Sequence, residues 1–261
     1  MRETSVEYGK KLDWSSVSDD YLRHRNGYPP SFFKLLRALK IGLPGQPILD
    51  LGTGTGALAI PFAKQKALVT GVDLAEGQIR AAKKRAESLK IHPNFFVAGA
   101  EKTGLPDNSF DVVTASMCWG YFDKEKAVPE IKRLLRPHGL LLISSILWVP
   151  QPGTIGERTN ELISRFNPEY DRRQPINLQQ KEPPEWARGH FRRQVRDIFN
   201  EPIQFTREGW RGRIRASKWI GAALSPDRID AFDAELEKLL EQEPSELQVL
   251  HAIGLEIYER A

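Results

Sequence analysis

The sequence predicts an α/β fold: a Rossmann-like, doubly wound sheet of about seven strands, mostly parallel, with helical cap additions. Two patterns predict it. Strand-like and helix-like segments alternate between residues 31 and 148, and the first strand runs into a glycine-rich turn that opens a helix. The composition suits a globular protein, because 40% of the 261 residues are hydrophobic and 28% are charged.

The elements of the core follow from short apolar runs and from helical periodicity. Apolar runs of strand length, bounded by turn residues, predict strands at 48–51, 68–72, 94–97, 110–115 and 140–148. Apolar residues that recur every three or four positions predict helices at 31–39, 57–66, 76–89 and 124–136. These segments form a repeating strand–helix order, which favours a parallel sheet covered by helices.

The regular alternation ends after residue 148, where the chain becomes rich in proline and arginine. Helices are predicted at 155–166, 206–220 and 226–241, and strands at 193–199 and 247–258. We predict a lid segment at 1–30, a nucleotide-binding core at 31–148, helical cap additions at 149–192 and 206–244, and final strands of the core sheet at 193–205 and 245–261.

Several features exclude other classes of protein. The longest apolar stretch, 140–149, is interrupted by Ser144 and Ser145 and is shorter than the roughly 20 residues of a membrane helix. The first residues lack the apolar segment of a secretory signal. The single cysteine, Cys118, cannot form an internal disulfide or a thiolate metal site on its own. We therefore expect a cytoplasmic protein with no membrane partner and no bound metal.

The strongest local signal is the glycine loop, ILDLGTGTGALA at 48–59. Gly52, Gly54 and Gly56 allow a sharp turn and a close approach to a ligand, and the next helix offers its free N–H groups to it. Asp73 ends the following strand about 20 residues after Gly52, at the distance where an acid reaches a ribose diol. The glycines alone also fit an NAD-dependent oxidoreductase. Asp50, beside the loop, favours a cofactor that carries an amino group over a pyrophosphate.

Four segments in order resemble the class I methyltransferases that use S-adenosylmethionine. They are ILDLGTGTG (48–56), VTGVDLAEGQI (69–79), VAGAEKTGLPDNSFDVV (97–113) and EIKRLLRPHGLLLIS (130–144). The likeness is to the small-molecule branch that includes the ubiquinone-biosynthesis and trans-aconitate methyltransferases. YLRHRNGYP, at 21–29, is similar to the lead-in segment of the latter.

This resemblance implies S-adenosylmethionine as the cofactor. The glycine backbone would hold its methionine part, Asp73 its ribose, Leu74 and Gln78 the adenine faces, Ala100 and Glu101 the adenine edge, and Ser116 and Met117 the sulfonium. The implied cofactor-binding residues are Gly52, Thr53, Gly54, Gly56, Asp73, Leu74, Gln78, Ala100, Glu101, Ser116, Met117, Tyr21 and Arg25. Two positions depart from the family's pattern: Gly99 replaces a usual Asp that contacts the adenine amine, and Gly120-Tyr121 replaces a common His-Trp.

Methyl transfer mainly needs donor and acceptor held in line, and it needs a base only if the acceptor arrives protonated. We therefore assign no catalytic residue. Trp119 and Trp148 follow the fourth and fifth strands, at the sheet edge where ligands bind in open α/β folds. The predicted acceptor-binding residues are Trp119, Tyr121, Trp148, Trp210 and Arg211.

The predicted helix 206–220 carries a basic stripe of Arg207, Arg211, Arg215 and Lys218 beside Trp210. Arginine grips carboxylates in a bidentate manner, so the stripe suits an acceptor with an apolar body and an anionic group. The alternatives are that the stripe faces water or pairs with the acidic residues of 227–246, and that the tryptophans form a small core of the cap.

We expect an enzyme that transfers a methyl group from S-adenosylmethionine to a small organic acceptor. Two other functions stay open: an RNA or protein methyltransferase, and a non-catalytic protein that binds the cofactor. The net charge of +4 and the arginines between 188 and 215 could suit nucleic acid. We do not expect a nucleic-acid partner, because the chain has no separate binding module. The acceptor molecule, the acceptor atom and the oligomeric state are not predicted.

Overall fold

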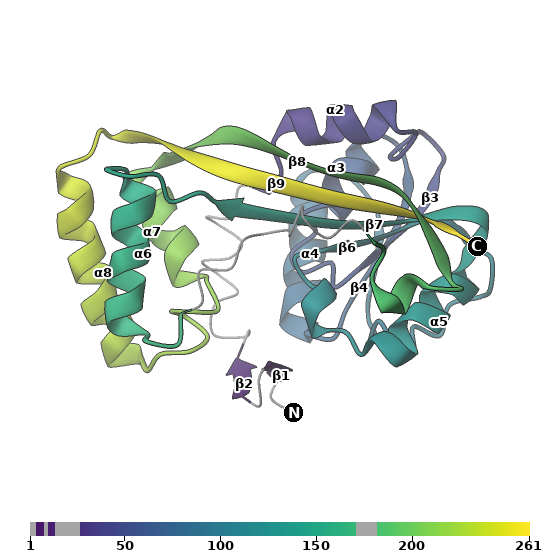
Figure 1. Ribbon diagram of the computed structural model, residues 1–261, viewed down its shortest axis with the longest axis horizontal. Coiled ribbons are helices and arrows are strands. Elements are labelled where there is room, and N and C mark those ends of the chain that lie inside the picture. Colours follow the sequence, from purple (N-terminus) through teal and green to yellow (C-terminus); the bar gives the residue numbers. More distant parts are fainter. Residues whose placement is uncertain (1–3, 8–9, 14–26, 171–181) are drawn as a thin grey trace. The chain divides into compact units, whose positions relative to one another are not determined.

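A computed structural model of the chain describes residues 4–7, 10–13, 27–170 and 182–261 (Figure 1). Its main sheet has seven strands in the order β5-β4-β3-β6-β7-β9-β8. The pairs β3–β4, β3–β6, β4–β5 and β6–β7 are parallel. The predicted Rossmann-like sheet with mostly parallel strands is confirmed.

The described residues form two compact units. The sheet unit contains 27–145, 182–198 and 254–261, and the helical unit contains 146–170 and 199–253. An antiparallel hairpin of β1 (Thr4–Glu7) and β2 (Lys10–Asp13) is also described. Most of the predicted lid at 1–30 lies outside the described residues.

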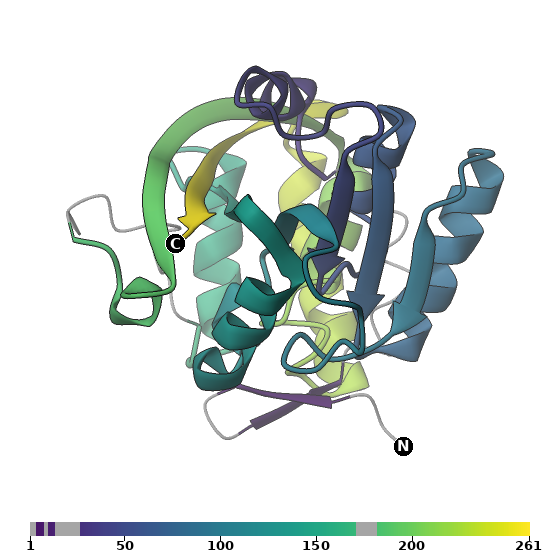
Figure 2. The ribbon, with the colours of Figure 1, turned by 90° about the vertical axis from the view of Figure 1, so that its right-hand side faces the viewer.

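The sheet unit holds the core elements that the sequence predicts. They are α2 (Pro30–Ala38), β3 (Pro47–Leu51), α3 (Ala59–Lys64), β4 (Leu68–Asp73), α4 (Glu76–Ser88), β5 (Asn94–Val97), β6 (Phe110–Ser116) and α5 (Lys124–Leu134). The unit also contains two short 3-10 helices that were not predicted, η1 (Trp119–Tyr121) and η2 (Glu185–Ala187). Figure 2 shows α2, the dark purple helix, above the dark blue strands β3 and β4, which lie side by side. Pro61 is the third residue of α3, where a backbone N–H has no acceptor within the helix, so the helix tolerates it.

Three long strands extend through both units: β7 (Leu135–Trp148), β8 (Phe191–Thr206) and β9 (Glu246–Arg260). The prediction placed the start of β7 at Leu140 and is corrected here. Leu135 pairs with Phe110, and Leu140 pairs with Val112, so the intervening residues form an irregularity in the strand. His138 takes a positive φ of 63° within it. Because this segment contains a proline and a glycine, its sequence pattern predicted a turn, but pairing with β6 keeps the segment in the sheet.

The helical unit contains α6 (Ile155–Phe166), α7 (Arg207–Arg215) and α8 (Pro226–Glu241). The bounds of α6 and α8 agree with the prediction. The predicted helix 206–220 is too long, because α7 ends at Arg215 and the chain then turns at Ser217, whose carbonyl accepts from Ile220 and Gly221. Lys218 therefore does not continue the basic stripe on α7.

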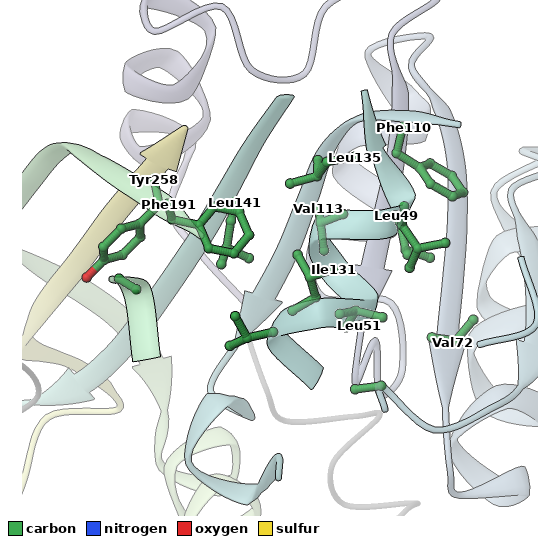
Figure 3. Close-up of a cluster of buried hydrophobic side chains, with 14 residues drawn as sticks. Leu49, Leu51, Val72, Phe110, Val113, Ile131, Leu135, Leu141, Phe191 and Tyr258 are labelled. Atoms are coloured by element: carbon green, nitrogen blue, oxygen red, sulfur yellow. The ribbon is translucent and has the colours of Figure 1, made fainter. Parts of the chain in front are cut away.

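Each unit has its own apolar core. In the sheet unit, side chains from β3, β4, β6 and α5 pack together with residues of β7, β8 and β9 (Figure 3). This cluster includes Leu49, Leu51, Val72, Val113, Ile131, Leu141, Phe191 and Tyr258. In the helical unit, Trp210, Phe232 and Leu236 lie at the centre of a second cluster. No helix in the described part of the chain combines the length and apolar character needed to cross a membrane.

Gly71 on β4 is the position where packing most directly requires a glycine. A Cβ on Gly71 would lie 2.6 Å from the Phe95 ring and 2.8 Å from Oγ1 of Thr53. We expect Gly71→Ala to lower the free energy of unfolding by about 1–3 kcal/mol through overpacking, as measured by denaturant titration. Gly120→Ala is the matched control, because a Cβ there meets nothing within 4 Å. Equal stability of the two variants would contradict this packing argument.

Candidate functional site

The glycine loop leaves β3 through three residues in the left-handed region. Gly52, Gly54 and Gly56 have φ angles of 59°, 55° and 83°. A side chain on Gly52 would also collide with Cys118, whose Sγ lies 2.8 Å from the position of the missing Cβ. The sequence therefore needs glycine here both for the backbone conformation and for packing, and the loop presents main chain rather than side chains.

Asp50, at the base of the loop, is a buried carboxylate with two hydroxyl donors. Thr53 of the loop donates to Oδ2 and Thr114 of β6 donates to Oδ1, each over 2.6 Å. Burial raises the pKa of Asp50 to about 6, although both hydroxyl hydrogen bonds favour its charged form. This carboxylate ties the loop to the neighbouring strand.

Asp73, at the end of β4, fixes the loop from the other side. Its Oδ2 accepts the backbone N–H of Gly54, and its Oδ1 accepts that of Ala75, each over 2.9 Å. A carboxylate oxygen can accept more than one hydrogen bond, so these backbone contacts do not by themselves prevent Asp73 from accepting hydroxyl groups of a ligand. The next residue, Leu74, is 70% exposed.

Leu74, Gly99 and Glu101 come together at the ends of β4 and β5. A Cβ on Gly99 would lie 3.3 Å from Oε2 of Glu101 and 3.4 Å from Leu74. The other oxygen of Glu101, Oε1, accepts the backbone N–H of Asp123 over 3.0 Å. Ala100 between them is buried. The carboxylate of Glu101 thus lies next to the point where a side chain at position 99 would begin, beside the exposed Leu74.

At the end of β6, Ser116 and Met117 are held by contacts to β7. Met117 has a positive φ of 59°, and its backbone N–H donates to the carbonyl of Ser144 over 2.9 Å. The hydroxyl of Tyr28 lies 2.9 Å from Oγ of Ser116 and donates to Oγ of Ser144 over 3.0 Å. Sequence reasoning did not single out Tyr28. In the sequence, Tyr28 belongs to the GYP that ends the lead-in segment at 21–29. That segment indicated the family resemblance and not a role for Tyr28.

The other residues predicted to bind a cofactor are placed as follows. Thr53 is buried and gives its hydroxyl hydrogen to Asp50. Gln78 on α4 is buried, and its Oε1 finds no hydrogen-bond partner within the described part of the chain. Tyr21 and Arg25 lie outside the described residues. The sheet unit therefore carries all the predicted cofactor-binding residues that the structure describes.

Two predicted acceptor-binding residues, Trp119 and Tyr121, form the short helix η1 directly after β6. The ring of Trp119 lies 4.8 Å from that of Trp186, and the ammonium of Lys124 lies 4.9 Å from the Trp119 ring. Neither Trp119 nor Tyr121 is fully buried. This aromatic segment follows the end of β6, and its role toward the acceptor stays a prediction.

Cys118 lies between these groups and has a structural environment. Its thiol donates to the carbonyl of Leu51 over 3.2 Å. Burial, with the nearby charges of Asp50 and Asp73, raises the pKa of the Cys118 thiol well above its ordinary value. A neutral thiol in this position is a poor nucleophile. Within the described residues, no group of three or more His, Cys, Asp or Glu side chains could hold a metal ion.

The other predicted acceptor-binding residues, Trp148, Trp210 and Arg211, belong to the helical unit. Trp210 is fully buried, and its Nε1 donates to Oγ1 of Thr159 over 3.0 Å. Trp148 donates from Nε1 to Oδ1 of Asn160 over 2.8 Å. These hydrogen bonds give both tryptophans a place in the core of this unit, which was one of the alternatives that the sequence left open.

Arg211 pairs with acidic side chains of the helical unit. Its guanidinium bonds Asp233 and Glu237 of α8, and Arg215 shares Asp233 over 2.8 Å. Glu208 contacts both arginines. Pairing with the acidic residues of 227–246 is the second alternative that the sequence left open, and the structure provides it.

Comparisons with known proteins relate this chain to methyltransferases. Residues 49–143 match a family model described as a methyltransferase domain. An uncharacterized methyltransferase of Mycobacterium tuberculosis is 30% identical over 185 residues, which cover 67% of this chain and 70% of the relative. A demethylmenaquinone methyltransferase of Thermus thermophilus is 38% identical over 112 residues, covering 41% of this chain and 51% of the relative.

A solved structure supports the same fold. It is a putative type II methyltransferase from Anaeromyxobacter dehalogenans, which aligns with a TM-score of 0.60 at 21% identity. The alignment covers 90% of this chain and 97% of that one.

The buried Asp50 predicts a pH-dependent contribution to stability. Its folded pKa of about 6 exceeds the ordinary value of 3.8, so the folded state binds this proton more tightly than the unfolded state does. The contribution of Asp50 to the free energy of unfolding therefore falls as pH rises from about 4 to about 6, by about 3 kcal/mol at most. Asp50→Asn cannot titrate, so the variant should lose this pH dependence relative to the native chain.

Denaturant titrations between pH 4 and pH 7 measure the effect. The stability of the native chain should fall relative to that of Asp50→Asn across this range. The exposed Asp230 provides the control, and Asp230→Asn should follow the native profile. Parallel profiles for Asp50→Asn and the native chain would show that burial does not perturb this carboxyl group.

Proposed function

The chain belongs to the class I S-adenosylmethionine-dependent methyltransferases, and we propose that it transfers the methyl group to a small organic acceptor by in-line displacement. The observation that carries the proposal is the glycine loop locked to Asp73 through Gly54, with Leu74 exposed beside it. Main-chain N–H groups, a carboxylate and an apolar surface together suit an adenosyl group with an amino acid tail.

The residues present fit the cofactor. We propose that the backbone at Gly52, Thr53, Gly54 and Gly56 holds the methionine part, and that Asp73 accepts both ribose hydroxyls. Leu74 would pack on the adenine with Gln78, while Ala100 and Glu101 follow its edge. Glu101 would take the place of the acidic residue that relatives carry at position 99, because its Oε2 lies 3.3 Å from the point where a Cβ at position 99 would be. Tyr21 and Arg25 stay in the proposed set from the sequence alone.

Bound S-adenosylmethionine supplies an electrophilic methyl group on a positively charged sulfur. The chain's own contribution is to hold donor and acceptor in line, which can be worth up to about 7–11 kcal/mol in ideal cases. Ser116 and Met117, fixed at the end of β6, would position the sulfonium. Trp119 and Tyr121 follow directly and would form a wall for the acceptor. We assign no catalytic base, since only an acceptor that arrives protonated would need one.

The acceptor is proposed to be a small molecule with an apolar body, as the aromatic segment at 119–121 favours. The name of the Thermus relative gives demethylmenaquinone as that protein's substrate. Trp148, Trp210 and Arg211 stay in the proposed set from the sequence alone, and each has a partner within the helical unit. An anionic group on the acceptor would have to compete with Asp233 and Glu237 for Arg211.

The same ion pairs argue against an RNA substrate. Arg211 and Arg215 pair with carboxylates, and Arg207 donates to the carbonyls of Glu241 and Glu243 at the end of α8. Phosphate binding needs cations that are available to solvent.

We propose a cytoplasmic location on the ground of the single cysteine.

A transfer assay with a labelled methyl donor tests the function. The chain should pass label from S-adenosylmethionine to one member of a panel of quinones, phenols and carboxylic acids.

Asp73→Ala should weaken S-adenosylhomocysteine binding at least about tenfold in calorimetry, because it removes two charge-assisted hydrogen bonds. Asp107→Ala, which changes an exposed carboxylate of the same unit, is the control. Binding of NADH without binding of S-adenosylhomocysteine would refute the proposal, and binding without transfer to any acceptor would favour a non-catalytic protein.

Arg211→Ala distinguishes a structural role of Arg211, in ion pairs with α8, from a role in binding an anionic acceptor. Because the guanidinium bonds Asp233, we expect the variant to unfold more easily by about 1–3 kcal/mol and to bind S-adenosylhomocysteine normally. Arg165→Ala breaks an exposed pair with Glu235 and should cost about 0–1 kcal/mol. Denaturant titration and the KM for the acceptor decide the matter. A raised KM with unchanged stability would instead assign Arg211 to the acceptor.

A further inference from the structure

Three hydroxyl groups meet at the end of β6, brought together from segments far apart in the sequence. Tyr28 precedes α2, Ser116 ends β6 and Ser144 lies opposite it on β7. The tyrosine oxygen is 2.9 Å from Oγ of Ser116 and 3.0 Å from Oγ of Ser144. The tyrosine ring is buried and stacks on Phe32 with 4.1 Å between ring centres. The cluster is therefore held by both polar and apolar contacts.

Hydrogen counting fixes the direction of these bonds. A tyrosine hydroxyl has one hydrogen, and that of Tyr28 is donated to Ser144. The contact between Tyr28 and Ser116 then requires Ser116 to be the donor. The hydrogen of Ser116 is thus committed to the tyrosine oxygen. Toward any further partner, the Ser116 oxygen can only accept.

The backbone holds this oxygen in place. Ser116 pairs with Ser144 in the parallel register of β6 and β7. Met117 follows with a φ of 59°, a conformation that a side-chain-bearing residue adopts only when its surroundings impose it, and its N–H is bonded to Ser144. Ser116 itself is only half-buried, unlike Ser144. Its oxygen can therefore meet a ligand.

We propose that Tyr28 is a positioning residue that makes Ser116 an acceptor-only oxygen for the sulfonium end of the donor. This inference rests on the proposed function. Oxygen lone pairs attract the positively charged sulfur and its polarised C–H groups. After transfer the sulfur is neutral, so the attraction is lost. The cluster therefore favours binding of S-adenosylmethionine over S-adenosylhomocysteine, which assists exchange of product for new donor.

The comparison of two ligands tests the proposal. Calorimetry should show that Tyr28→Phe and Ser116→Ala raise the Kd of S-adenosylmethionine about 3- to 10-fold, the effect of one lost hydrogen bond. The Kd of S-adenosylhomocysteine should stay within about twofold, because its sulfur carries no charge. Tyr258→Phe is the matched control. It removes another buried tyrosine hydroxyl of the sheet unit, one that donates to Glu256, and should leave both Kd values unchanged.

The outcomes are distinct. If the native chain binds neither ligand, the proposed function fails and this inference falls with it. If the native chain binds both, and Tyr28→Phe and Ser116→Ala weaken both ligands equally or weaken neither, the cluster is only structural and the inference alone is overturned. Should Tyr28→Phe fail to fold, Ser116→Ala decides, since it keeps the tyrosine and its stacking on Phe32.

Discussion

A buried carboxylate holds the functional end of the sheet unit together. Asp50 is 2% exposed and binds the hydroxyls of Thr53 and Thr114, so the first turn of the glycine loop cannot move away from β6. Asp73 binds the same loop at Gly54 from the opposite strand. A loop built on glycine would otherwise be free to adopt many conformations. The two carboxylates replace that freedom with one arrangement, in which the main chain is ready to meet a ligand.

The same carboxylates set the electrostatic character of the site. The charge of Asp73 adds to the burial that raises the pKa of Asp50, and both charges raise the pKa of Cys118. Glu101 contributes a further carboxylate close to Leu74. Neighbouring negative groups repel one another, which is a cost to folding. A donor with an amino group and a sulfonium offsets that repulsion when it binds, so the arrangement suits a positively charged cofactor.

Local signals explain which parts of the fold the sequence could predict. Strands β3 to β6, helices α6 and α8, and the glycine–Asp73 spacing follow from patterns within a few dozen residues. The exceptions depend on distant partners. Leu135 continues a strand only because Phe110 pairs with it. The Tyr28 cluster joins residues 88 and 116 positions apart, a distance at which no periodicity carries information.

The helical unit shows why side chains that look ready to bind a ligand need to be checked for internal partners. Tryptophan and arginine on one helix face suggest a binding surface, yet Trp210 donates to Thr159 and Arg211 is surrounded by carboxylates. Buried polar atoms must be paired, so a small core made of aromatic and basic residues uses their hydrogen-bonding groups itself. Near Trp148 this holds even for Arg213, which is buried and lies 5.5 Å from the indole ring. Trp119 and Tyr121, in η1 after β6, are only partly buried, and acceptor specificity is therefore best sought there first.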